Sequence, residues 1–284
     1  MSEIQGTDQN KQQLRTLLRK YEGKIAAMVP RHLDGRRLFQ VYMVAAQKGR
    51  GLSECLPMSI IGAIVQAAQL GLSLDTVFGE AYLIPRWNKH QQAKVAQFQI
   101  GYKGLRKLAL QADPELRDVY AHEVYEHDHF SYTYEPPELK FRPAEDPEAR
   151  GKLKYAYAKA IWRDEYDRFV VLTTPEINKI KKASDAATSK DSPWTNWEEA
   201  MWRKSALRKL LGSLTLSADS PIVKAMGAED VDGEEAAEME ALPSIEDAPQ
   251  LGERQPALDA VADSAGEQQE APKQRRRRRA DAEA

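Results

Sequence analysis

The first fifty residues carry apolar positions at helical spacing in two segments. The first segment covers residues 11–29 and stops at Pro30, because proline does not continue a helix. The second starts after Asp34, a residue type that caps helix N-termini, and ends at Gly49 or Gly51. The apolar positions are Leu14, Leu17, Leu18, Tyr21, Ile25 and Met28, then Leu38, Phe39, Tyr42, Met43 and Ala46. We predict two amphipathic helices that pack on their own domain or on a neighbouring subunit, and the sequence favours the first arrangement.

The next part of the chain predicts a buried helix, a strand hairpin and a second helix. Residues 57–72 are apolar on nearly all sides, which is typical of a buried helix. Two short apolar runs at 81–84 and 95–100 flank a polar connection and predict two strands. A helical pattern begins at the turn 101–104, whose sequence is GYKG, and Pro114 ends it.

Residues 116–173 alternate between apolar and polar positions and predict antiparallel strands. Prolines within 136–147 break this region into a loop, and the turn 164–167 joins the last two strands into a hairpin. Thr174 begins a short helix as its N-cap, and a long helix is predicted over 193–211. The fold class is therefore α+β, with a small antiparallel sheet and hairpins packed against helices.

The charge of the 284-residue chain is unevenly distributed, although its net value is only −2. Residues 228–271 contain 14 acidic side chains and one arginine, and the last thirteen residues contain the run Arg275–Arg279. Residues 1–227 hold 34 basic and 27 acidic side chains, a net charge of +7. A basic body is typical of nucleic-acid-binding proteins.

The composition also suggests three regions. Residues 1–50 form an N-terminal helical region that offers an oligomer contact, and residues 51–227 form the core. Residues 228–284 lack aromatic side chains and are rich in Pro, Glu, Asp, Ala and Gln, so we predict a disordered acidic tail that ends in the arginine run.

Several classes of protein are disfavoured by composition. Cys55 is the single cysteine, so an internal disulfide is excluded. No apolar run approaches the length of a membrane span, and the first ten residues lack the features of a signal peptide. We expect a cytoplasmic protein without a membrane partner.

Basic and aromatic side chains gather at the turns of the unit 79–111. Lys103, Arg106 and Lys107 share one side of its helix at i, i+3, i+4 spacing, and Arg86 precedes the hairpin loop. Such a mixture suits single-stranded nucleic acid, because phosphates bind cations and bases stack on aromatic rings. The alternative is that these cations are ordinary solvated surface residues.

A second mixed face is predicted in the helix 193–211. It consists of Trp197, Met201, Lys204 and Arg208, which are spaced at i, i+4, i+7 and i+11. The short helix before it adds Lys179 and Lys182 as candidate DNA-binding residues. The alternative is that Trp197 belongs to the core and that the two cations of the longer helix reach over it.

Candidate catalytic groups are few. His122, His127, Asp128 and His129 lie close in sequence, but their spacing is not HExxH, and a solvated strand end is the favoured interpretation. No nucleophile–base arrangement and no GxxxxGK[ST] motif stand out. We therefore expect no catalytic residue, no metal and no cofactor. The alternatives are a metal-dependent DNA nuclease that uses this histidine cluster and an RNA chaperone.

Four separated motifs resemble the RecT family of phage single-strand DNA annealing proteins. They are IGAIVQAAQLGLSLD at 61–75, GEAYLIPR at 79–86, QFQIGYKGLRKLA at 97–109 and WTNWEEAMWRKSALRKL at 194–210, in the order and spacing of the family. The final helix departs from the family pattern at Ser205 and Lys209, where Thr and Arg are expected.

This resemblance implies ATP-independent binding of single-stranded DNA and annealing of complementary strands in phage-type recombination in a bacterial host cell. It also implies a homo-oligomeric ring or helical filament, annealed duplex as a further ligand, and a partner exonuclease together with a host single-strand-binding protein. By motif, it assigns Lys103, Lys204 and Arg208 to the DNA. Arg86, Arg106, Lys107, Lys179, Lys182 and Trp197 are DNA-binding candidates from their charge, ring chemistry and spacing.

Overall fold

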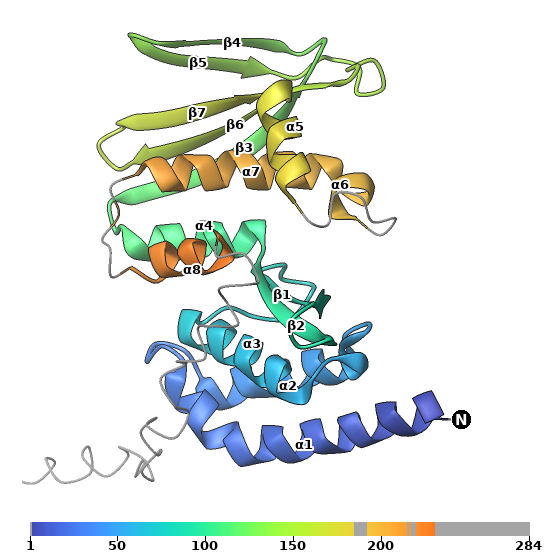
Figure 1. Ribbon diagram of the computed structural model, residues 1–284. Helices are drawn as coiled ribbons and strands as arrows, with labels where there is room; N and C mark the ends of the chain where they lie inside the picture. Colours follow the sequence, from blue (N-terminus) through green and yellow to red (C-terminus); the bar gives the residue numbers. More distant parts are fainter. Residues whose placement is uncertain (1, 185–191, 215, 217–219, 231–284) are drawn as a thin grey trace, which may run out of the picture. The chain divides into compact units, whose positions relative to one another are not determined.

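The N-terminal part of the chain is helical. The computed structural model describes residues 2–184, 192–214, 216 and 220–230 (Figure 1). Its first elements are α1 (Ser2–Met28), α2 (Gly35–Lys48), the short 3-10 helix η1 (Leu52–Glu54) and α3 (Pro57–Leu70). The predicted helical pair is confirmed, although the first helix begins at Ser2 rather than at residue 11. Asp34 caps α2 as predicted, because its Oδ1 accepts hydrogen bonds from the backbone N–H groups of Arg36 and Arg37.

The apolar sides of α1 and α2 pack within the chain. Leu18 and Ile25 of α1 and Phe39 of α2 are buried in the core that α3 shares. The Tyr42 hydroxyl donates a hydrogen bond to the Leu72 carbonyl over 3.0 Å, just beyond the end of α3. In the described part of the chain, these buried faces therefore serve the protein's own core, as the sequence favours. No helix among the described residues has both the length and the apolar character needed to cross a membrane.

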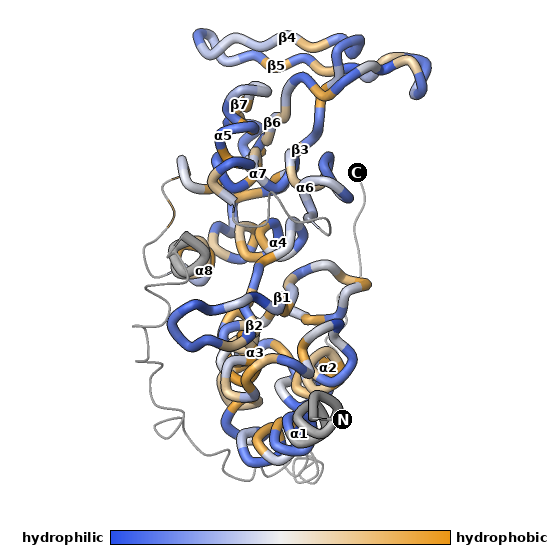
Figure 2. Tube along the Cα trace, turned by 45° about the vertical axis from the view of Figure 1, so that its right-hand side comes forward, coloured by the Kyte–Doolittle hydropathy of each residue, from blue (hydrophilic) through white to orange (hydrophobic). Residues whose placement is uncertain are grey.

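A strand hairpin and a helix follow. They are β1 (Ala81–Asn88), β2 (Ala93–Ile100) and α4 (Tyr102–Ala112), which match the predicted strand–loop–strand–helix unit. The strands are antiparallel, with Ala81 opposite Ile100 and Asn88 opposite Ala93. Ala96, Phe98 and Ile100 alternate along β2 and are buried on the side that packs against α3. The connection between the strands is strongly hydrophilic (Figure 2).

The second sheet contains three antiparallel strands in the order β3-β6-β7. Its strands are β3 (Leu116–Tyr125), β6 (Leu153–Trp162) and β7 (Asp167–Thr173), and a separate hairpin contains β4 (His129–Tyr134) and β5 (Pro137–Arg142). In β6, Ala156, Ala158 and Ala160 belong to the main core, whereas Tyr155 and Tyr157 belong to an aromatic cluster. The main-core side carries the long C-terminal helix (Figure 1), and the aromatic side carries the rings of β4 and β5.

The C-terminal helices differ from the prediction in three respects. They are α5 (Thr174–Ala183), α6 (Pro193–Asn196), α7 (Glu198–Ser213) and α8 (Pro221–Asp230). The short helix is capped by Thr173 rather than by Thr174, the long helix is interrupted, and a further helix follows it. A continuous helix over 193–211 is wrong, because Trp197 adopts φ −142° and ψ 48° between α6 and α7. In a straight helix, Trp194 and Trp197 would share one side at i, i+3 spacing. The break places Trp194 in the core and leaves Trp197 at the surface.

Helix α8 was not predicted, and it crosses the expected border between core and tail. It continues to Asp230, whereas the tail was expected to begin at residue 228. Ile222 and Ala225 are buried, and α8 packs against α3 and α4. Residues 228–230, which the sequence analysis assigned to the tail, are helical, and residues 231–284 lie outside the described residues.

The position of this border leads to a testable prediction. Truncation after Asp230 is expected to leave the melting temperature within a few degrees of the full chain. Truncation after Ser220 removes α8 and its buried side chains, and is expected to lower the melting temperature by about 5–15 °C. Thermal unfolding of both variants measures the difference. An equal loss in the two variants would show that residues beyond Asp230 stabilise the fold.

Candidate nucleic-acid interface

The side of the β1–β2 hairpin that faces away from α3 carries a row of polar and aromatic side chains. We call this row the hairpin face, and its polar and aromatic members are Tyr82 and Arg86 on β1 and Gln97 and Gln99 on β2. Tyr82 lies opposite Gln99, and the alternation of the strands puts all four on the same side. The apolar side chains of Ile84 and Val95 lie on the same side of the hairpin. Four positions separate Tyr82 from Arg86, a distance of about 13 Å along a strand. The hairpin face can therefore follow an extended chain.

Arg86 has an unusual environment within this row. Its side chain is partly buried, and its Nε atom is enclosed without a hydrogen-bond partner among the described residues. An enclosed donor without an acceptor costs about 1–3 kcal/mol, more when the group is charged. Because the side chain as a whole is partly exposed, the Arg86 guanidinium is a candidate contact for an anionic ligand on the hairpin face.

Close backbone contacts fix Lys103 at the end of the hairpin. The Gly101 N–H donates to the Glu80 carbonyl over 2.8 Å. A Cβ atom on Gly101 would lie 2.2 Å from the Gly79 carbonyl oxygen, and one on Gly104 would lie 2.1 Å from that of Glu80. Only glycine permits this approach. The first turn of α4 is therefore pressed against the start of β1, and Lys103 is exposed there with its Cδ close to Gly79.

The other two cations of α4 have partners. Arg106 pairs with Asp118 of β3 over 2.6 Å. Lys107 pairs with Glu80 over 2.9 Å and donates to the Gly71 carbonyl over 3.0 Å. Within the described residues, Lys103 has no such ion pair. The basic side predicted for this helix is therefore divided, and Lys103 is its cation most open to a ligand.

A second group lies where α5 ends beside the start of α7. Trp197 is 71% exposed, so it is not a core residue. Lys179 and Lys182 are exposed on α5. Lys181 lies 3.7 Å from Glu198, and this ion pair ties the last turn of α5 to the first turn of α7. The structure thus brings Trp197 near the C-terminal turns of α5, which carry the two predicted lysines.

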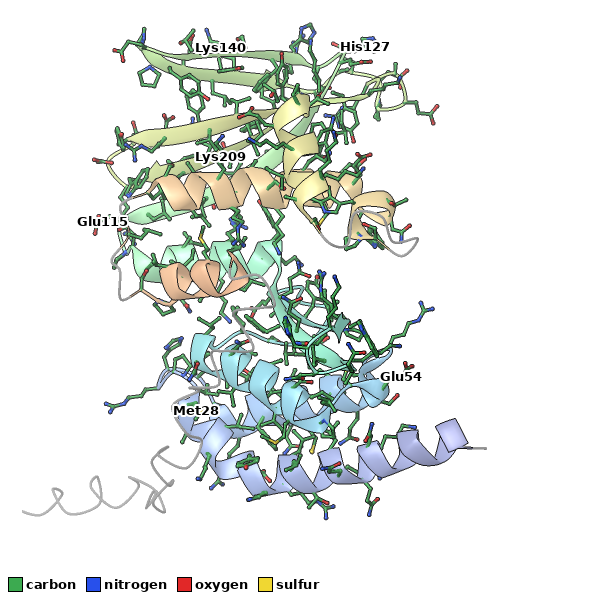
Figure 3. The ribbon with its side chains drawn as sticks, viewed as in Figure 1. Met28, Glu54, Glu115, His127, Lys140 and Lys209 are labelled. Carbon is green, nitrogen blue, oxygen red and sulfur yellow. The ribbon has the colours of Figure 1, made fainter. Side chains whose placement is uncertain are left out.

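Lys204 and Arg208 lie farther along α7 and are partly buried. The Nη2 atom of Arg208 donates to the Met226 carbonyl of α8 over 2.9 Å. This hydrogen bond helps to hold α8 against α7. The DNA contact that the motif implies for Arg208 would come in addition to this structural role. Lys209, labelled in Figure 3, instead pairs with Glu176 of α5 over 3.1 Å.

The sequence did not single out Tyr82, Gln97 and Gln99. The signal was present, because Gln97 and Gln99 alternate with the apolar positions 96, 98 and 100. Strand periodicity thus indicated that the glutamines share one face. It did not indicate that α3 covers the opposite face, since that contact joins distant parts of the chain.

The histidine cluster is not assembled into one site. His122 packs against the rings of Tyr157 and Phe141, with centroids 5.7 and 6.0 Å away, and burial lowers its pKa. His127 lies near the entry to the β4–β5 hairpin (Figure 3), with Nδ1 2.6 Å from the Ala149 carbonyl oxygen. In the part of the chain that the structure describes, no group of three or more His, Cys, Asp or Glu side chains is placed to hold a metal ion.

Asp128 is a structural anchor. Its buried carboxylate accepts two hydrogen bonds from Arg150, over 2.9 and 2.6 Å, and others from the backbone N–H groups of Tyr125 and Ala144. Burial alone would raise the pKa of Asp128, but these hydrogen bonds outweigh it and lower the pKa to about 2. The interaction ties the loop after β5 to the turn between β3 and β4.

Comparisons with known proteins agree with the motifs. A sequence model of the RecT family matches residues 37–242. Protein RecT of Escherichia coli (strain K12) is 34% identical over 200 residues, which cover 69% of this chain and 72% of that protein. Uncharacterized protein YqaK of Bacillus subtilis (strain 168) is 28% identical over 173 residues, which cover 59% of this chain and 56% of that protein.

These matches define the class as a DNA recombination and strand-annealing protein. The chain belongs to the RecT family, and the resemblance inferred from the four motifs is confirmed.

The Asp128 anchor predicts a specific dependence of stability on pH. A carboxylate whose pKa is lower in the folded state than its ordinary value of 3.8 stabilises the fold above that value. This stabilisation, about 2 kcal/mol, is lost as the pH falls from about 4 towards 2. Asp128→Asn is therefore expected to lower the melting temperature at pH 7, with a difference from wild type that shrinks in acid.

The matched control is Asp146→Asn in the same loop, since Asp146 is exposed and its Oδ1 accepts only the Glu148 N–H within the described residues. Thermal unfolding between pH 2 and 7 measures both variants. A pH-independent loss in Asp128→Asn would contradict the assigned role of the ionised carboxylate.

Proposed function

We propose that this protein binds single-stranded DNA along the hairpin face and Lys103, and anneals it to a complementary strand without ATP. The observation that carries the proposal is the partly exposed side chain of Arg86, whose Nε has no hydrogen-bond partner among the described residues, on the same face as an exposed tyrosine. Membership of the RecT family supports the same activity. The four RecT-like motifs within 61–210 favour 51–227 as the annealing core.

The chemistry required is modest. Cations that hold phosphates reduce the repulsion between two polyanionic strands. Contacts to the backbone carry no sequence information, so the base edges of the bound strand remain available to a partner strand. Base pairing and stacking in the new duplex then provide the driving force. The sequence contains no GxxxxGK[ST] motif, which agrees with annealing without nucleotide hydrolysis.

We propose the group around Trp197 as a second set of contacts to the bound strand. An exposed indole can stack on a base, and Lys179 and Lys182 can contact phosphates. Lys204 and Arg208 lie one turn apart on α7, and we retain them as candidates from the family motif. Arg106 and Lys107 support the site indirectly, because their ion pairs with Asp118 and Glu80 hold in place the helix that carries Lys103.

The proposal includes an assembly. We infer a homo-oligomeric ring or helical filament, with residues 1–50 as an added contact between copies. We also infer the cytoplasm of a bacterial host as the location, a partner exonuclease that produces the single strands, and a host single-strand-binding protein as a further partner. Family membership supports oligomerisation and DNA binding.

A strand-annealing assay tests the function. Two complementary labelled oligonucleotides are mixed with the protein, with and without ATP, and duplex formation is followed by energy transfer. The protein is expected to accelerate annealing, and the rate is expected to be the same with and without ATP. Fragments appearing with Mg²⁺ or Mn²⁺ would instead indicate a nuclease, and preferential binding of RNA of the same sequence would indicate an RNA chaperone.

Salt dependence tests the site. The variant Arg86→Ala, Lys103→Ala is expected to bind single-stranded DNA more weakly, with the slope of log K against log salt reduced by about 1.4 for two lost phosphate contacts. Its melting temperature is measured alongside to confirm folding.

Lys152→Ala is the control, because it also removes an exposed positive charge but lies in the loop before β6. It is expected to bind like wild type. A folded double variant with an unchanged slope would show that the hairpin face does not contact phosphates.

A further inference from the structure

Two large apolar side chains are exposed next to each other before β1. Val77 is 79% and Phe78 55% exposed, although side chains of this kind are usually buried. They occupy the turn between α3 and β1 and follow Leu74, which is buried in the core. An exposed apolar pair at a turn is a candidate interaction site, which its surroundings have to support.

Hydrogen bonds hold this turn rigid. The Asp75 carboxylate accepts from the Val77 N–H over 3.0 Å, and its carbonyl accepts from the Phe78 N–H over 3.1 Å. The Ser73 N–H donates to the Glu80 carboxylate over 2.8 Å, which fixes the two ends of the turn to each other. Phe78 is therefore displayed on a preorganised support, and little further ordering is needed when it binds a ligand.

The surroundings of Phe78 identify the ligand. The next residue, Gly79, has φ +65°, and a Cβ atom there would lie 3.1 Å from the Tyr82 hydroxyl and 3.8 Å from Lys103 Cδ. Phe78 thus immediately precedes the point where an exposed tyrosine and an exposed lysine meet. Among the described residues, no side chain caps the N-terminus of α4, and the first turn of a helix carries a positive partial charge. Two rings, a cation and a helix N-terminus suit a base together with its phosphate.

We propose that Phe78 stacks on a base of the bound strand whose phosphate is held by Lys103, with Val77 covering the edge of that base. This inference rests on the proposed function and adds a stacking contact to the backbone contacts of the hairpin face. Stacking tolerates any sequence, since every base has a π face. The contact fits a protein that must anneal strands of any sequence.

The test separates stacking from charge. Phe78→Ala is expected to weaken binding of an oligonucleotide by about 5- to 140-fold, the range for one lost base stack, and to leave the salt slope unchanged. Phe78→Trp is expected to retain binding. An oligonucleotide that contains 2-aminopurine reports the stack directly, and its quenching on binding is expected to be lost in Phe78→Ala and kept in Phe78→Trp.

The matched control is Tyr166→Ala, because Tyr166 is also 55% exposed but lies in the turn between β6 and β7. It is expected to bind like wild type. If Phe78→Ala binds with wild-type affinity, the inference is overturned. The proposed DNA contacts of the hairpin face are not affected by that result. A reduced salt slope would show that Phe78 acts through the phosphate contacts instead.

Two further outcomes would also overturn the inference. A change in oligomer size of Phe78→Ala without DNA, measured by light scattering, would assign the exposed pair to a contact between copies of the chain. Failure of the wild-type protein to bind single-stranded DNA would remove the proposed function itself.

Discussion

The alternation of small and aromatic residues in β6 is the constraint on which the second half of the fold depends. Ala156, Ala158 and Ala160 are fully buried, and their small side chains let α7 lie close to the sheet. Tyr155 and Tyr157 occupy the opposite face and pack with the rings of the β4–β5 hairpin. One strand therefore supports two cores. The position of α7 against the alanines also sets where α5, α8 and the exposed Trp197 lie.

A similar constraint fixes the candidate site at the backbone level. Gly101 and Gly104 bring α4 against the start of β1 more closely than any side chain would allow. The ion pair between Lys107 and Glu80 strengthens this contact, and Glu80 in turn holds the Ser73 N–H. The charges nearest the hairpin thus serve two purposes. Lys107 and Glu80 fix the geometry, whereas Lys103, which has no ion pair among the described residues, is the cation that we propose to contact DNA.

Periodicity explains which parts could be predicted from the sequence. The N-terminal helices, the buried helix over 57–72 and the hairpin of β1 and β2 depend on local patterns, and the sequence predicted them. The break at Trp197 was missed, because it depends on tertiary packing, which buries Trp194 and leaves Trp197 exposed. The pairing of Arg106 was missed as well, because spacing places a cation on a helix face but does not identify Asp118, which lies on another element. The class of function could be predicted from the motifs. Which cations form ion pairs within the protein could not.

The small number of cations proposed as contacts on the hairpin face has a consequence for the proposed activity. The proposed contacts of Arg86 and Lys103 would hold two phosphates on the hairpin face, and two contacts alone would give this face a weak and salt-sensitive hold on single-stranded DNA. Copies arranged along one strand would add their contacts without any new chemistry, because each further binding event is then intramolecular. Weak individual contacts would also let a mispaired strand leave before the next copy engages. On this argument, assembly and annealing depend on each other, and a tightly binding monomer would anneal less well than an oligomer of weak binders.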